Sequence, residues 1–128
     1  SRKVITVGCN EGGYFGERNS LCEHYSGREA EDTDLRKPDI VAPGTDIVSC
    51  CSQVRHNLYG WQNAYMEKSG TSMSTPIVSG AAALCLEKCP DAQNYEVKRR
   101  ILYTATDLRE PWYKQGWGML NIDRMLDF

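Results

Sequence analysis

The residues best suited to chemistry lie in the sequence GTSMSTP at positions 70–76. A serine hydroxyl is a weak nucleophile that reacts only beside a base and a group that stabilises an oxyanion. If a helix begins at Thr71, the hydroxyl of Ser72 projects from its first turn, and the Ser72 N–H can face an oxyanion. The capping rule places the start later, because Ser74 shortly before Pro76 is typical of a helix cap followed by proline. On that second interpretation the residues before Ser74 are only a loop.

The other candidate groups are two histidines and one acidic cluster. His24 and His56 lie in polar loops, where an isolated histidine is usually a surface residue, so we expect neither to act as a general base. The acidic residues at 29–34 lack the regular spacing of a cation-binding loop. We therefore expect a solvated loop there, with no metal site and no cofactor.

The element that must position Ser72 is the uncharged run that follows Pro76. The residues from Ile77 to Leu86 are apolar or small around the whole circumference of a helix, which predicts a central helix buried on every side. Its positive N-terminal end would lie beside Ser72, where negative charge could develop.

Short β-branched segments elsewhere predict the sheet of an α/β protein. Val4–Cys9 indicates a strand that is buried on both faces, as in a parallel sheet. Residues 38–44 form a brief extended segment framed by prolines, and residues 46–51 are another candidate strand. Further on, we expect an amphipathic helix from Asn94 to about Thr104, with Asn94 as its N-cap. Asn121 is expected to cap a last helical turn.

The composition is that of one modest globular domain. The 128 residues are 41% hydrophobic and 25% charged, with a net charge of −2. This balance gives no basic footprint for nucleic acid, and no apolar run is long enough to span a bilayer. The chain does not begin with Met and has no visible signal peptide, so we expect a processed product or an excised piece.

The six cysteines form no Cys-x-x-Cys pair, so a zinc site is not indicated. Cys50 and Cys51 are adjacent in a candidate strand, and their side chains should point to opposite faces. We expect mostly buried free thiols, which favours a reducing or anaerobic setting.

Taken as a whole, the string at 70–76, followed by Val78 and the small residues at 80–84, resembles the nucleophile motif of the subtilisin-like serine proteases, the subtilases. Four further segments resemble elements of the same family in the same order: residues 4–8, 25–27, 37–44 and 116–121. The resemblance implies a three-layer α/β fold with a parallel sheet and a buried central helix that begins before Pro76. It implies that Ser72 is the acylating nucleophile, that the Ser72 N–H donates to the oxyanion and that Thr71 supports this site.

This chain lacks three elements that subtilases carry before the nucleophile. Subtilases carry an aspartate in an Asp-Ser/Thr-Gly element, a histidine in a His-Gly-Thr element and a later asparagine in the oxyanion hole, and none of these precedes Ser72 here. In subtilisin itself, loss of the serine or the histidine lowers turnover about 2 × 10⁶-fold. We therefore predict that residues 1–128 are the C-terminal part of a single, incomplete catalytic domain and are inactive alone.

Three functional hypotheses remain open at this stage. The first is a serine endopeptidase fragment that acts on peptides or proteins once the upstream portion of its domain, or self-association, covers the central helix. The second is a subtilase-like pseudoprotease, a binding scaffold without catalysis. The third is an independent interaction module. Subtilases are commonly secreted, whereas the cysteines favour a reducing compartment, so the sequence does not fix the localisation.

Overall fold

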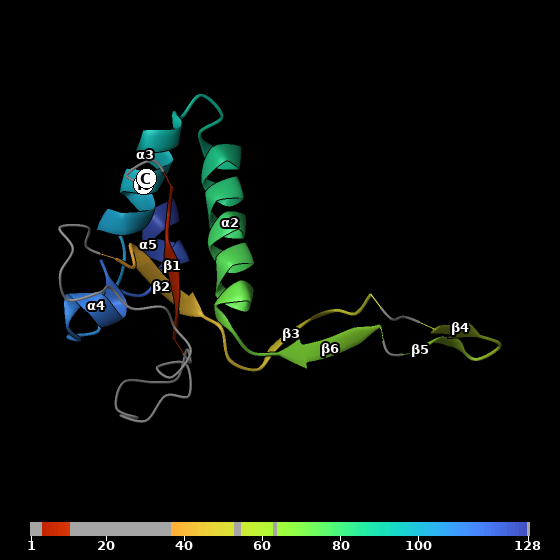
Figure 1. The fold of residues 1–128 in the computed structure, drawn as a ribbon. Coiled ribbons are helices and arrows are strands. Elements are labelled where there is room, and N and C mark those ends of the chain that lie inside the picture. Colours follow the sequence, from red (N-terminus) through yellow and green to blue (C-terminus); the bar gives the residue numbers. More distant parts are fainter. Residues whose placement is uncertain (1–3, 11–36, 53–54, 63, 128) are drawn as a thin grey trace.

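The computed structural model describes residues 4–10, 37–52, 55–62 and 64–127. His24, the acidic residues at 29–34 and the segment 25–27 lie outside the described residues. The described part of the chain divides into an α/β body and a long two-stranded arm that projects from it (Figure 1).

The centre of the body is a short parallel sheet. Strand β1 (Val7–Asn10) pairs in parallel with β2 (Ile40–Pro43), with Val7 opposite Ile40. The segment around Met119 extends this sheet on the other side of β2. The Val41 N–H donates to the Gly118 carbonyl at 3.0 Å, and an isolated parallel β-bridge pairs Val41 with Met119. The predicted parallel α/β sheet is therefore confirmed.

Helices pack against this sheet and against one another. They are α2 (Thr71–Lys88), α3 (Asn94–Tyr103), α4 (Trp112–Gln115) and α5 (Ile122–Leu126). The core that they share with the sheet consists of apolar side chains that are almost fully buried: Ile40, Ala42, Val78, Ala81, Cys85, Val97, Ile101, Leu102 and Met125. This core fixes α2 beside β1 and β2, which sets the position of the start of α2.

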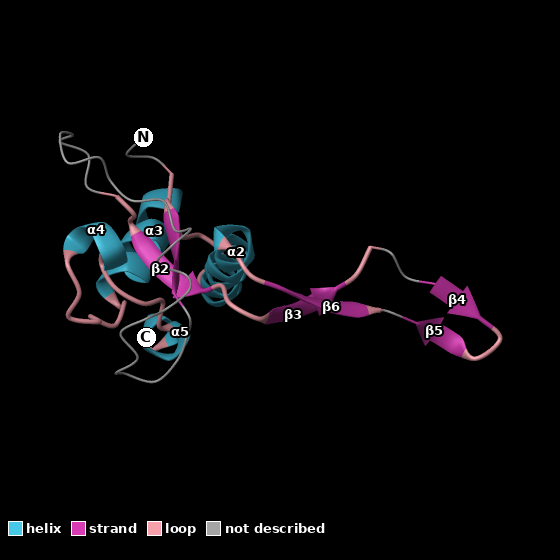
Figure 2. Ribbon diagram, turned by 60° about the horizontal axis from the view of Figure 1, so that its bottom comes forward, coloured by secondary structure: helices cyan, strands magenta, loops and turns pink. Residues whose placement is uncertain are grey.

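The arm consists of two antiparallel ribbons that follow one another. Strand β3 (Ile47–Cys50) pairs with β6 (Tyr65–Lys68), and further out β4 (Arg55–Asn57) pairs with β5 (Gly60–Gln62). Figure 2 shows the arm leaving the body at the N-terminal end of α2. At its tip Leu58 and Tyr59 are 100% and 92% exposed.

Helix α2 departs from the prediction that it is buried on every side. Val78, Ala81 and Cys85 face the core, but Leu84 and Leu86 are 42% and 41% exposed. The described elements that pack against α2 are β1, β2, α3 and α5, and they cover one stripe of it. Leu84 and Leu86 lie on opposite sides of this stripe, and both are partly open to solvent.

The helix caps differ in part from those expected. Helix α3 begins at Asn94, but its N-cap is Gln93, whose N–H donates to the Glu96 carboxylate at 2.7 Å. A glutamate at the third helical position can reach back to the cap N–H, and this contact shifts the cap by one residue. The Asn121 cap of α5 is confirmed, since its side chain accepts from the Arg124 N–H at 2.9 Å.

One carboxylate links β1, β2 and α3. Asp39 accepts from the Thr6 N–H at 2.7 Å and from Lys37 at 2.5 Å, and Lys98 of α3 lies 3.6 Å away. Burial alone would raise the pKa of Asp39, but the hydrogen bonds from Lys37 and Thr6 and the charge of Lys98 outweigh it, so the pKa is lowered. The ionised form of Asp39 therefore stabilises the folded chain.

The described cysteines are in two states. Cys50, Cys51, Cys85 and Cys89 are thiols outside any disulfide, but Cys9 is disulfide-bonded, so the expectation of free thiols is wrong for Cys9. The expectation that the thiols are mostly buried is also wrong, because only Cys85 among these four is buried. Within the described ranges, no three His, Cys, Asp or Glu side chains gather as metal ligands would. No helix in the described part of the chain is long and apolar enough to cross a membrane.

Candidate active site at the start of helix α2

Helix α2 begins at Thr71, directly after Gly70, and Pro76 lies inside it. The capping interpretation, which placed the start near Pro76, is therefore wrong, and the start implied by the subtilase resemblance is confirmed. The reason lies in Ser74. Its side chain is fully buried, and its hydroxyl donates to the Ala42 carbonyl of β2 at 3.0 Å. The hydroxyl that would have capped a helix instead ties the first turn of α2 to the sheet.

Pro76 changes the backbone beneath the nucleophile motif. Proline has no N–H, so Pro76 cannot donate to the Ser72 carbonyl four residues earlier, as an ordinary helical residue would. Thr75 supports the first turn, because its hydroxyl donates to the Thr71 carbonyl at 3.0 Å. Within this turn the Met73 N–H donates to the Gly70 carbonyl at 2.9 Å, and it is the first backbone N–H of the helix that does so. The N–H groups of Thr71 and Ser72 precede it, in the region of a helix that is suited to an anion.

Ser72 is exposed and lines an open groove of about 540 Å³ between α2 and the arm. The groove is lined mainly by apolar side chains from both elements, with Lys68 as its charged member. Its lining residues are Ile47, Val48, Ser49, Cys50, Ser52, Met66, Lys68, Ser72, Met73, Pro76 and Ile77. An extended chain laid in this groove would pass the Ser72 hydroxyl.

The base of the arm is fixed close to Ser72. The Gly70 N–H donates to the Gly44 carbonyl at 2.7 Å, so the two ends of the arm meet just before α2. A Cβ at Gly44 would lie 2.2 Å from the Ser74 hydroxyl oxygen and 2.5 Å from the Cys9 sulfur. The close approach of β1, β2 and α2 at this point therefore requires glycine.

No general base accompanies Ser72 among the described residues. The groove is lined by no described histidine, aspartate or glutamate. The backbone of His56 lies out on the arm in β4, opposite Trp61. Sequence reasoning assigned no base to the chain, and the described groove adds none.

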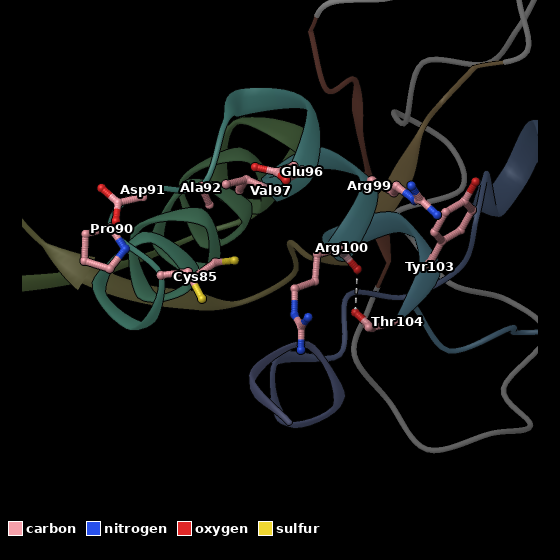
Figure 3. Close-up of a pocket in the computed structure, with 11 residues that line it drawn as sticks. Cys85, Pro90, Asp91, Ala92, Glu96, Val97, Arg99, Arg100, Tyr103 and Thr104 are labelled. Atoms are coloured by element: carbon pink, nitrogen blue, oxygen red, sulfur yellow. Dashed lines mark hydrogen bonds between the residues drawn. The ribbon is translucent and has the colours of Figure 1, made fainter. Parts of the chain in front are cut away.

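A larger groove of about 640 Å³ lies at the far end of α2, between that helix and α3 (Figure 3). It includes the free thiols Cys85 and Cys89, and sequence reasoning did not predict it. Arg100 at its edge already donates to the carbonyls of Met125 and Asp127, at 2.6 and 2.8 Å. This basic side chain thus holds α5 in place.

Comparison with known proteins identifies the family. The model of the subtilase family matches residues 1–118, so the chain belongs to the subtilases, a family of serine proteases. It is 37% identical over 115 residues to the serine protease AprX of Bacillus subtilis (strain 168), which covers 84% of this chain and 25% of that protein. It is 43% identical over 84 residues to a subtilisin of Bacillus pumilus, which covers 66% of this chain and 27% of that protein.

Solved structures agree with this assignment. The fold matches the CspB protease of Clostridium perfringens with a TM-score of 0.73 at 29% identity, over 97% of this chain and 26% of that one. It matches fervidolysin of Fervidobacterium pennivorans with a TM-score of 0.72 at 26% identity, over 98% of this chain and 19% of that one. The chain thus has a subtilisin-like α/β fold and spans about a quarter of the length of these two curated relatives.

Proposed function

We propose that this chain supplies the nucleophile of a serine endopeptidase, with Ser72 as the attacking residue. The observation that carries the proposal is the position of Ser72: exposed, in the first turn of α2, on the wall of an open groove. Membership of a family of serine proteases makes peptides or proteins the expected substrates.

The chemistry follows from the groups at the start of α2. The Ser72 hydroxyl oxygen attacks a peptide carbonyl carbon while a base takes its proton, and the carbonyl oxygen becomes an oxyanion. The Ser72 N–H would donate to that oxyanion, and Thr71 would support the site. The leaving amine takes the proton, and water then releases the acyl group from Ser72.

The base, its orienting aspartate and the side-chain oxyanion donor would come from the remainder of the domain. The part of α2 outside the core stripe, with Leu84 and Leu86 on its two flanks, is where that remainder would pack, because exposed apolar side chains are stabilised by burial. Residues 1–128 alone would then turn over no substrate, and they would self-associate through this part of α2. A monomer at micromolar concentration in sedimentation would contradict the second statement.

The second candidate function is a pseudoprotease, a subtilase scaffold that binds a partner without catalysis. It is favoured if the remainder of the domain lacks the base. The intact Ser72 and its accessible groove support the protease instead.

A fluorophosphonate probe separates the two. This probe phosphonylates only an activated serine, whose hydroxyl oxygen displaces fluoride from phosphorus, so the complete protein should be labelled at Ser72 and should cleave a peptide substrate. Ser72→Ala should abolish labelling and lower turnover about 10⁶-fold. Ser79→Ala removes another exposed hydroxyl from the same helix and should change neither. A folded complete protein that is not labelled would be a pseudoprotease.

A further inference from the structure

Two side chains close the base of the arm immediately before the nucleophile. The Ser69 hydroxyl oxygen accepts from the Asp46 N–H at 2.9 Å and donates to the Asp46 carboxylate at 3.2 Å. The two residues are 23 positions apart, one at each end of the arm. We call this reciprocal pair the Asp46–Ser69 clasp.

The backbone at the clasp is held in an unusual conformation. Asp46 has a φ of 54°, in the left-handed region that few residues other than glycine, asparagine and aspartate adopt readily. This conformation turns both the N–H and the carboxylate of Asp46 toward one hydroxyl.

The clasp lies two residues before the helix that carries Ser72. Beside it the Gly70 N–H donates to the Gly44 carbonyl at 2.7 Å, and α2 begins at Thr71. Three hydrogen bonds therefore join the outgoing and the returning chain just before Ser72. The arm beyond these bonds is long and exposed. Without them, the backbone that leads from the arm to Ser72 would be less restricted.

Exposure separates a positioning role from a role in overall stability. Both clasp residues are exposed, and hydrogen bonds in contact with water add little to the stability of a fold. A nucleophile is far more sensitive to position, because a displacement of about 1 Å can lower a rate about 100-fold. The clasp should therefore affect the reactivity of Ser72 much more than folding.

We propose that Asp46 and Ser69 are positioning residues that hold the first turn of α2 in the geometry in which Ser72 reacts. This inference rests on the proposed function, since it concerns the reactivity of Ser72. It gives the base of the arm a part in catalysis, although neither Asp46 nor Ser69 needs to touch the substrate.

The test compares variants of the complete protein. Ser69→Ala removes both hydrogen bonds of the clasp, whereas Ser69→Thr keeps the hydroxyl. Ser79→Ala is the matched control, because it removes an exposed hydroxyl of α2 that bonds within the helix. For each variant we would measure the rate of Ser72 phosphonylation per titrated site, kcat and KM for a short uncharged peptide, and the thermal midpoint.

Ser69→Ala should lower the phosphonylation rate and kcat by roughly tenfold, with KM and the thermal midpoint little changed. Ser69→Thr and Ser79→Ala should react like the wild type. A wild-type rate in Ser69→Ala would overturn the proposal, and so would a loss in rate that only follows a loss of folded sites. If wild-type Ser72 is not phosphonylated at all, the proposed function fails and this inference fails with it; a labelled wild type with an equally fast Ser69→Ala overturns the clasp alone.

Discussion

Replacing Ser74 by alanine tests the contact that places the start of α2. The Ser74 side chain is fully buried, and its hydroxyl donates to the Ala42 carbonyl at 3.0 Å. Loss of a neutral hydrogen bond costs about 1 kcal/mol, and a buried carbonyl left without that donor raises the cost to about 1–3 kcal/mol. The void left by one oxygen atom adds only about a few tenths of a kcal/mol. We therefore expect Ser74→Ala to lower the free energy of unfolding by about 2 kcal/mol.

The assay is urea unfolding of the complete protein, inhibited at its active site so that it does not digest itself. The midpoint should fall without a change in the slope of the transition, which reports the surface exposed on unfolding. Ser79→Ala removes a hydroxyl that donates to the Thr75 carbonyl at 3.1 Å on the exposed side of α2, and it should stay within about 0.5 kcal/mol of the wild type. If Ser74→Ala is as stable as Ser79→Ala, the bond to Ala42 does not hold the helix start.

Two further predictions concern acid stability and oxidation. Because folding lowers the pKa of Asp39, its contribution to stability is fully present above the unfolded value of 3.8 and is lost as the pH falls through the folded pKa. Asp39→Asn should therefore be less stable than the wild type at pH 7 and should lose less stability as the pH falls below 3.8; parallel curves of unfolding free energy against pH would refute this. Met73 lines the groove beside Ser72, so its oxidation to the polar sulfoxide should lower activity, and Met73→Leu should resist peroxide. Full turnover with Met73 oxidised would place Met73 away from the reacting groups.

The sequence determined the elements whose signals are local. The β-branched run before Gly8 predicts a short buried strand, the residues before Gly44 predict a brief extended segment, and the periodicity of residues 94–104 predicts α3. The Asn121 cap also follows from sequence, because an N-cap bond reaches only three residues along the chain. The string at 70–76 was specific enough to indicate the family, which the comparison over residues 1–118 confirms.

The tertiary structure decided the features that depend on distant contacts. Local rules placed a cap at Ser74, but its hydroxyl bonds to Ala42, 32 residues earlier, and α2 therefore begins at Thr71. The composition of α2 predicted burial on every side, yet burial depends on which elements are present to pack, and the described ones cover a single stripe. The hydrogen bonds between Asp46 and Ser69 likewise have no signal in the sequence around either residue. The two residues are 23 positions apart, and they meet only because the arm folds back on itself.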